Sequence, residues 1–298
     1  MVHINKNVLQ KTEVTIFVEK PKSILTFLHK YRWPLITMIV AFLMGFIGYI
    51  IIVFGGGLIV KDEDFVLNQT TMFETVDGEI VGELYEQKRQ LISIEEIPNH
   101  VIEAFVAIED HRFFDHAGID ARSVLRAIYR DVLSFSKVEG ASTITQQLAK
   151  NLFLTHEKTW MRKTKEVMAA IYLERHYSKY ELLELYLNTI YFGHGLYGIE
   201  TAAQFYFSKG AEALTISEGA LLAGLIKAPT NYSPIDHPDK ALSRRNLVLE
   251  AMADQGFLKK ETQLREQRKT LGLQVAESKY YTAYDTVIYT VTRHAPHN

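Results

Sequence analysis

Glu109 and Asp110 close a mostly apolar segment and are the first residues in the chain that suggest chemistry. Helical spacing places Glu109 on roughly one face with the apolar Phe105 and Phe113. A carboxylate on such a face loses solvation, so its pKa rises and it suits proton transfer. Two other interpretations stay open. One is a helix-end carboxylate paired with Arg112, and the other is a metal site whose spacing matches no standard ligand motif.

A second polar cluster begins at residue 140 with the string Gly-Ala-Ser-Thr-Ile-Thr-Gln-Gln. Ser142 is a good helix N-cap, which predicts a helix from there onward. Ser142, Gln146 and Lys150 then share one polar face, because residues four apart are neighbours on a helix. Such a face could hold a sugar or a phosphate, or it could be an ordinary solvated surface.

A third cluster, at 162–166, surrounds a carboxylate with cations in the string Arg-Lys-Thr-Lys-Glu. On a helix, Arg162 and Lys163 are neighbours of Glu166. Cations lower the pKa of a nearby carboxyl group, so Glu166 is expected to stay ionised and to be a poor general acid. It could organise a diphosphate or a bridging metal ion. The alternative is a helix-surface ion pair, which would stabilise the protein little.

Helices must position these clusters. A fourth cluster, at 184–200, is rich in glycine and aromatic residues and is typical of a tight turn between helices. Residues 71–85 alternate around Asp77-Gly78, which predicts a small β-hairpin. Helical periodicity then continues to about Lys260. The predicted helices are 101–113, 120–135, 142–152, 160–176, 179–189, 198–206, 216–227 and 240–254.

Residues 33–60 contain no charged side chain. A helix needs about 20 apolar residues to cross a bilayer, so this segment predicts a transmembrane anchor rather than a buried core helix or a cleaved signal peptide. Residues 1–32 carry an excess of lysine and arginine, whereas the chain beyond the anchor opens with acidic residues. The basic side is therefore expected to stay cytoplasmic.

Composition excludes several classes of function. The chain has 298 residues, 47% of them hydrophobic and 23% charged, with a net charge of −2. This near-neutral balance does not favour nucleic-acid binding. The chain has no cysteine, so disulfides, thiolate metal sites and cysteine nucleophiles are excluded.

Together the clusters resemble the glycosyltransferase family of penicillin-binding proteins and of monofunctional peptidoglycan glycosyltransferases. The family's first motif is matched by Glu-Asp at 109–110 with Phe113, His116 and Gly118. The strings Gly-x-Ser-Thr-Ile-Thr-Gln-Gln and Arg-Lys-x-x-Glu stand intact at 140–147 and 162–166. Tyr-Leu-Asn and Tyr-Phe-Gly follow at 186–188 and 191–193, and a fifth element covers 220–234. The match extends over roughly residues 71–260.

The resemblance implies a mainly α-helical, lysozyme-like fold with two lobes, preceded by one transmembrane helix and a short hairpin. The expected organisation is a cytoplasmic tail at 1–32, an anchor at 33–56, a stalk at 57–90, a glycosyltransferase domain at 91–270 and a linker-like tail at 271–298. Many family members continue into a transpeptidase domain. Transpeptidation is not expected here, because Ser-Phe-Ser-Lys at 134–137 lies within the glycosyltransferase region and no Lys-Thr-Gly string exists.

The resemblance also implies a reaction. Lipid II would be joined to a growing glycan strand with inversion, forming β-1,4 links and releasing undecaprenyl diphosphate. Glu109 would be the general base, and Glu166 would stabilise the leaving diphosphate, with a divalent cation (Mg²⁺ or Mn²⁺) as cofactor. The substrate-binding residues implied by the motifs are Asp110, Phe113, His116, Arg126, Ser142, Thr143, Gln146, Gln147, Lys150, Asn151, Arg162, Lys163 and Lys165.

The implied partners are lipid II, the growing strand, the bacterial plasma membrane and other cell-wall synthesis proteins, with the catalytic domain outside the cell. Two competing interpretations remain. A lysozyme-like hydrolase would also place a carboxylate in a helical cleft, but it needs no cationic diphosphate site. An inactive scaffold that binds glycan or protein partners would be favoured by loss of Glu109 or Glu166, and both are present.

Overall fold

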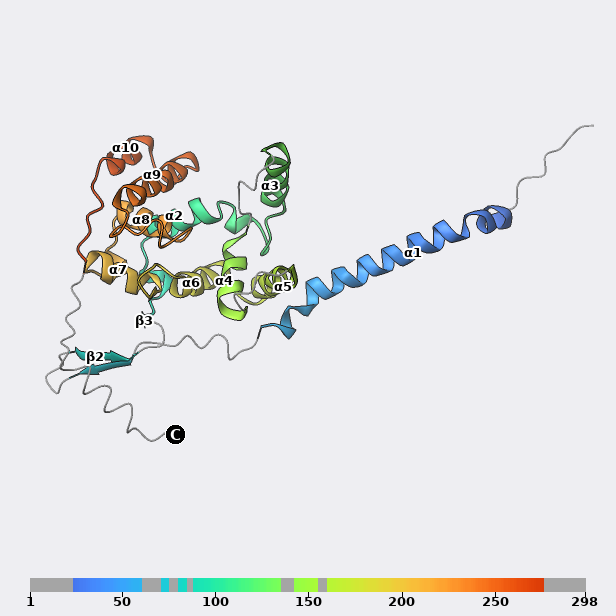
Figure 1. Cartoon of the computed structure of the whole chain (residues 1–298), viewed down its shortest axis with the longest axis horizontal. Helices are drawn as coiled ribbons and strands as arrows, with labels where there is room; N and C mark the ends of the chain where they lie inside the picture. The colour runs from blue at the N-terminus through green and yellow to red at the C-terminus, as the bar shows by residue number, and fades with distance from the viewer. Residues whose placement is uncertain are drawn as a thin grey trace, which may run out of the picture. The chain divides into compact units, whose positions relative to one another are not determined.

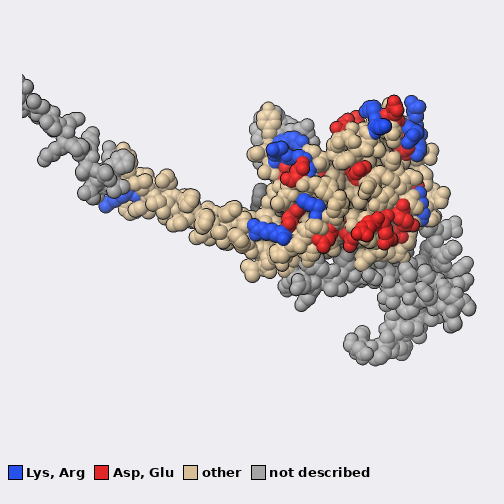
Figure 2. Space-filling model, turned by 180° about the vertical axis from the view of Figure 1, so that it is seen from behind, with Lys and Arg blue, Asp and Glu red and all other residues tan. Residues whose placement is uncertain are grey.

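The structure is a computed structural model, and it describes residues 24–60, 71–74, 80–84, 88–134, 142–154 and 160–275. The chain divides into two compact units, Met1–Ile50 and Ile51–Asn298. Helix α1 covers Ile24–Phe54, and the 3-10 turn η1 covers Gly55–Leu58 (Figure 1). Among the described residues, one segment, Tyr31–Leu58, is long and apolar enough to cross a membrane, with a mean hydropathy of 2.6. Figure 2 shows it as a rod that is uncharged over most of its length. The predicted N-terminal apolar helix is confirmed.

Strands are few in the described part of the chain. β1 (Thr71–Glu74) pairs antiparallel with β2 (Ile80–Leu84), with an irregularity between Phe73 and Glu74. These two strands confirm the predicted hairpin, whereas its turn at 77–78 lies outside the described residues. β3 (Lys88–Arg89) pairs parallel with β4 (Leu196–Tyr197), a pairing that the sequence did not predict.

The remainder is helical, as predicted. The helices are α2 (Asn99–Glu109), α3 (Ala121–Ser134), α4 (Ile144–Phe153), α5 (Trp160–His176), α6 (Lys179–Thr189), α7 (Ile199–Phe207), α8 (Ile216–Leu225), α9 (Pro238–Asp254) and α10 (Lys260–Gln267). Short 3-10 turns occupy Ile94–Glu96, Phe113–Asp115 and Ala211–Ala213. Helix α10 was missed, because its mostly polar sequence carries no apolar period.

Two groups of helices make up the unit that follows the anchor. Helices α2, α8, α9 and α10 pack on one another, and α4 packs on α5 and α6 (Figure 1). Between the groups, the ring of Phe105 on α2 meets the ring of Phe192, which follows α6, edge-on at 6.2 Å between centroids. Both phenylalanines are fully buried. The two groups therefore share a continuous apolar core, in agreement with the expected two-lobed helical fold.

Helix α2 ends at Glu109, so the prediction of a helix over 101–113 was wrong at its C-terminal end. Asp110 leaves the helix with φ −158° and ψ 74°, and its carboxylate accepts a hydrogen bond from the backbone N–H of Ile144 at 3.1 Å. Phe113 lies instead in the following 3-10 turn and is fully buried. Glu109 and Phe113 therefore do not share a helix face, because a tertiary contact ends the helix between them.

Helix α4 is capped by Thr143 and not by Ser142 as predicted. The Thr143 hydroxyl accepts from the backbone N–H of Gln146 at 3.2 Å, and the Gln146 side chain accepts from the backbone N–H of Thr143 at 3.1 Å. This reciprocal pair is a capping box, which satisfies two backbone donors at once. Ser142 precedes the helix, so the predicted polar face of Ser142, Gln146 and Lys150 does not form.

A buried arginine holds the C-terminal part of this unit together. Arg245 on α9 is fully buried, and its guanidinium donates to the backbone oxygens of Gln267 at 2.9 Å, Lys269 at 2.8 Å and Thr270 at 3.1 Å. It also donates to the Ser217 hydroxyl on α8 at 3.1 Å. One side chain thus joins α8 and α9 to the end of α10.

Replacing Arg245 by methionine is expected to lower the free energy of unfolding by about 3 kcal/mol, because three backbone carbonyls and the buried Ser217 hydroxyl lose their donor at once. The measurement is urea unfolding of the detergent-solubilised protein. Arg268→Met at the end of α10 is the matched control, since that residue is exposed, and its cost should stay below about 0.5 kcal/mol. Equal losses of unfolding free energy in the two variants would contradict the stabilising role of the Arg245 hydrogen bonds.

Candidate active site

A cleft of 580 Å³ opens between the two groups of helices. It is lined by the last turn of α2, the first half of α3, the beginning of α4 and residues from α9 and the segment after α8. The lining residues are Ala107, Ile108, Glu109, Asp110, His111, Asp120, Ser123, Arg126, Ala127, Ser142, Thr143, Gln147, Lys150, Ile226, Lys227 and Arg244. The cleft therefore collects polar side chains from Glu109 to Arg244, which are 135 positions apart in the sequence.

Glu109 is the last residue of α2 and presents its carboxylate to the cleft. Burial raises the pKa of this carboxyl group above its ordinary value. A hydrogen bond from Gln147 and the charges of Arg244 and Lys227 oppose the shift without cancelling it. The prediction of a raised pKa is confirmed, and the higher basicity makes Glu109 better suited to accept a proton.

Gln147 fixes the position of that carboxylate. Its side-chain Nε2 donates to Glu109 Oε2 at 2.8 Å, while its Oε1 accepts from the hydroxyl of Tyr186 at 3.2 Å. Tyr186 is fully buried on α6, and burial raises its pKa well above the ordinary value. The phenol therefore stays protonated and donates to Gln147 Oε1, which leaves the amide nitrogen of Gln147 to donate to Glu109. Tyr186 was assigned to architecture from the sequence, yet it orients this part of the site.

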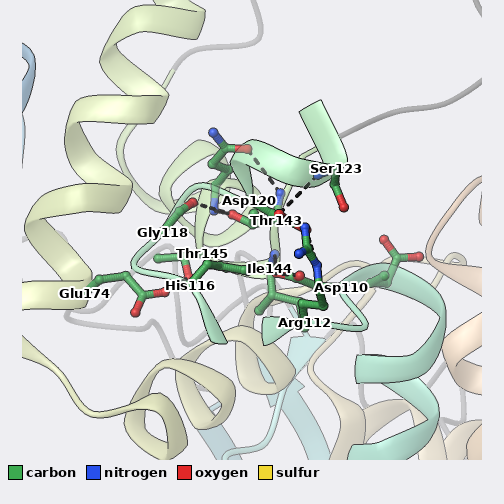
Figure 3. Close-up of polar contacts among 12 residues, drawn as sticks. Asp110, Arg112, His116, Gly118, Asp120, Ser123, Thr143, Ile144, Thr145 and Glu174 are labelled. Atoms are coloured by element: carbon green, nitrogen blue, oxygen red, sulfur yellow. Dashed lines mark hydrogen bonds and ion pairs between the residues drawn. The ribbon is translucent and has the colours of Figure 1, made fainter. Parts of the chain in front are cut away.

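Asp110 joins the loop after α2 to the start of α4 (Figure 3). It is buried, and besides the Ile144 N–H it accepts from Nε2 of His116 at 2.9 and 3.0 Å. The carbonyl oxygen of His116 in turn accepts from Lys179 at 2.7 Å. These contacts make Asp110 and His116 positioning residues, of which Asp110 lines the cleft and His116 does not.

Asp120 organises the beginning of α3 (Figure 3). Its carboxylate accepts from the backbone N–H groups of Arg122 and Ser123, both at 3.1 Å, and pairs with the guanidinium of Arg112. Burial tends to raise the pKa of Asp120, but the hydrogen bonds from Arg112 and Ser123 outweigh it and hold the pKa well below its usual range. The carboxylate is thus charged throughout the useful pH range and fixes the helix that carries Arg126 into the cleft.

The cationic cluster lies beside this cleft on α5. Glu166 is buried and accepts from Arg162 at 3.1 Å and from Lys163. Lys163 also donates to the hydroxyl of Ser142 at 2.9 Å, and Ser142 lines the cleft. The predicted Arg-Lys-x-x-Glu cluster is therefore joined to the cleft through one hydrogen bond.

The structure sorts the other predicted site residues by location. Asp110, Arg126, Thr143, Gln147 and Lys150 line the cleft with Ser142 and Glu109. Phe113 and Gln146 are buried in the protein, and Asn151 and Lys165 are exposed without lining the cleft. Their predicted contact with substrate remains a prediction.

Lys227 and Arg244 were missed as site residues. Both line the cleft, and both act electrostatically on Glu109. Arg244 on α9 lies with its guanidinium 5.8 Å from the centroid of the Tyr232 ring. Adjacent arginines at 244 and 245 were the available signal. Arg245 is buried. Successive residues of a helix point in different directions, so Arg244 cannot share that buried position.

The residues around Glu166 do not form a ready-made site for a divalent cation. Both carboxylate oxygens of Glu166 already accept from cationic side chains. Within the described residues, no three histidine or acidic side chains come together as a site built from protein ligands alone would require. The donor set around Glu166 therefore does not fit a resident metal ion.

A buried carboxyl group in a cleft, fixed by an amide and flanked by cations, defines an enzyme-like site on a helical fold. The family described as "Transglycosylase" matches residues 77–253. The chain belongs to this family.

Its relatives include penicillin-binding protein 1F of Bacillus subtilis (strain 168), which is 50% identical over 262 residues, 88% of this chain and 37% of the relative. Penicillin-binding protein 1A of Aquifex aeolicus (strain VF5) is 52% identical over 184 residues, 62% of this chain and 25% of the relative. Penicillin-binding protein 1A of Haemophilus influenzae is 43% identical over 206 residues, 69% of this chain and 24% of the relative. The chain thus spans well under half the length of these relatives.

Proposed function

We propose that this chain is a peptidoglycan glycosyltransferase, which polymerises lipid II into glycan strands. The proposal rests on one observation: the site contains two carboxylates whose electrostatic environments are opposite. Glu109 is desolvated and aligned by Gln147, whereas Glu166 is saturated by cations one hydrogen bond away from the same cleft. One carboxylate is thus suited to take a proton and the other to organise an anionic leaving group.

In the proposed reaction, Glu109 removes the proton from the sugar 4-hydroxyl of lipid II. The hydroxyl oxygen then bonds to the anomeric carbon of the growing strand, and the bond from that carbon to the diphosphate oxygen breaks. The glycosidic link forms with inversion, and the electron pair leaves with the lipid diphosphate. Gln147 and Tyr186 support this step by keeping Glu109 in one orientation.

The leaving diphosphate carries negative charge that must be stabilised. Arg162 and Lys163 are held on α5 by their bonds to Glu166, and Lys163 reaches the cleft through Ser142. Lys150 and Arg126 add positive charge to the lining. Cations held in place before the reaction stabilise developing charge without reorganisation during it. A hydrolase has no need of such a cluster, which favours the polymerase.

The membrane anchor suits a substrate that is itself lipid-linked. An enzyme tethered beside its substrate gains effective concentration in the plane of the bilayer. In this proposal the basic residues before α1 stay on the cytoplasmic side and the catalytic unit faces outward, following the distribution of lysine and arginine. Lipid II, the growing strand and the plasma membrane are then the partners.

Chelation of divalent cations is expected to leave the thermal unfolding temperature of the protein unchanged, because the residues around Glu166 do not fit a resident ion. The measurement is a thermal scan of the solubilised protein with EDTA and then with excess Mg²⁺ or Mn²⁺. A fall with EDTA that either cation restores would instead reveal a protein-held site, since ligands of the folded state raise its stability.

The test of the proposed function is incubation of the solubilised protein with labelled lipid II, followed by gel separation of the products. A ladder of glycan strands is the expected result. Cleavage of preformed glycan without polymerisation would favour the hydrolase. Absence of both activities, with lipid II binding retained, would favour the scaffold.

A further inference from the structure

Three consecutive glycines follow α1, and the middle one packs directly on α5. Gly56 is buried. A Cβ atom built on it would lie 2.5 Å from the backbone oxygen of Met168 and 2.5 Å from Cβ of Tyr172. Real Cβ atoms do not approach other atoms so closely, and the Met168 oxygen is backbone that cannot swing away. Glycine is therefore required for this contact, in which backbone meets backbone.

Neighbouring residues extend the same contact. A Cβ at Gly57 would meet the Tyr172 ring at 3.4 Å. Arg175, one turn further along α5, donates to the backbone oxygen of Val53 at 2.7 Å and lies 5.1 Å from the centroid of the Phe54 ring. Residues 53–57 are thus fixed to α5 by packing, a hydrogen bond and a cation–π contact. All of these residues belong to the unit that starts at Ile51.

Other glycines of the apolar segment lack this property. A Cβ at Gly45 or at Gly48 would have nothing within 4 Å. The close contact is therefore specific to the end of the segment and is not a general feature of its glycines. Gly45 and Gly48 provide matched positions for comparison.

The contact lies close to the cationic cluster. Glu166 precedes Met168 by two residues on the same helix, which is about 3 Å along the axis. The candidate membrane span ends at Leu58, so the contact lies where the chain leaves the hydrocarbon. The diphosphate of a lipid-linked sugar lies at this same level, just outside the hydrocarbon. Helix α5 therefore joins the cluster at 162–166 to the point where the chain leaves the hydrocarbon.

We propose that Gly56 and Arg175 are positioning residues that lock the end of the membrane span to α5, which holds the Arg162–Lys163–Glu166 cluster at the depth of the substrate diphosphate. This role rests on the proposed function. It adds that catalysis on membrane-embedded substrate depends on the lock, whereas the chemistry in the cleft does not.

The test compares two substrates for each variant: lipid II embedded in liposomes with the protein, and a water-soluble lipid II analogue with a short prenyl chain. Gly56→Leu is expected to lower kcat/KM on embedded lipid II on the order of tenfold, below the ~100-fold that a misplacement of about 1 Å can cost. Rates with the soluble analogue should stay close to those of the parent. Gly45→Leu and Gly48→Leu should match the parent on both substrates.

Arg175→Gln provides a second variant at an exposed position, where folding is expected to be retained. It should show the same selective loss on embedded substrate, and Arg175→Lys should restore part of it. Equal losses on both substrates, or no loss on either for both variants, would overturn the role of the lock. A parent inactive on both substrates would overturn the proposed function, and the lock's catalytic role with it.

A chemical cross-link tests the contact itself, independently of activity. The chain contains no cysteine, so Gly57→Cys and Tyr172→Cys together introduce the only pair of thiols. Removal of the tyrosine ring makes room for the new side chain at 57. A short bifunctional thiol reagent is expected to join the pair in membranes and to fail after denaturation. Failure in the folded, membrane-embedded protein would overturn the lock.

Discussion

Glu109→Gln is expected to abolish glycan polymerisation, with a loss in kcat of about 10²–10⁴, the contribution typical of a general base. Glutamine keeps the size of the side chain but cannot accept a proton at neutral pH. Gel separation of products from labelled lipid II gives the initial rates. Binding of lipid II should change far less than kcat, because the cations that face the substrate remain.

Glu103→Gln is the matched control for this variant. Glu103 lies on the same helix, and burial also raises its pKa, against the opposing charge of His100, but it does not line the cleft. Its replacement should leave the rate near that of the parent. Similar losses from both substitutions would indicate damage to α2 and would remove Glu109 from the role of base.

The raised pKa of Glu109 also predicts two dependences on pH. The base must be ionised, so the rate should rise with pH through the raised pKa and level off above it. The effect on stability has the opposite sign. A carboxyl group that binds its proton more tightly in the folded state favours folding at low pH, and this contribution is lost as pH rises through the raised pKa. Glu109→Gln should therefore increase stability at neutral pH.

Glu166→Gln is expected to lower kcat by about 10²–10³, the cost typical of losing one preorganised electrostatic group. Without the carboxylate, Arg162 and Lys163 lose the acceptor that holds them, and both are left to reorient. Stability should also fall, because breaking a buried ion pair costs about 3–5 kcal/mol. The measurement is a rate assay at a temperature well below unfolding, together with urea unfolding.

Glu174→Gln separates the two effects. Glu174 lies on the same helix as Glu166, is equally buried, with a side-chain exposure of 4%, and pairs with Lys179. It also accepts from Thr145, but it does not line the cleft. Both variants should lose stability, whereas only Glu166→Gln should lose rate in the remaining folded protein. Comparable rate losses in the two would show that the ion pair on α5 acts through folding alone.

Local signals predicted some helices to the residue. The helix at 179–189 matches its prediction, because Ser178 and Glu181 form a capping box that is readable in the sequence. The raised pKa of Glu109 was also predicted, although the helix face on which that prediction rested holds for Phe105 and not for Phe113. The motif strings predicted that Ser142, Gln147 and Lys150 belong to the site, and all three line the cleft.

Other features depended on contacts between distant residues and were not predictable in this way. The end of α2 is set by the bond from Ile144 to Asp110, and these residues are separated by 34 positions. Arg244 reaches Glu109 only because α9 packs on α2. The N-cap of α4 was predicted at Ser142, one residue before the observed Thr143, since both are good N-caps and only tertiary structure chooses between them.

Asp110 has one more consequence. It closes the last turn of α2, in one group of helices, and accepts from the first residue of α4, in the other. One hydrogen bond therefore joins the two groups of helices directly beside Glu109. Glu109 precedes Asp110 and Gln147 follows Ile144 by three residues, so the bond between Asp110 and Ile144 fixes the neighbourhood in which Gln147 meets Glu109. In the proposed polymerisation, this bond keeps the base and the amide that orients it together while the glycan strand lengthens.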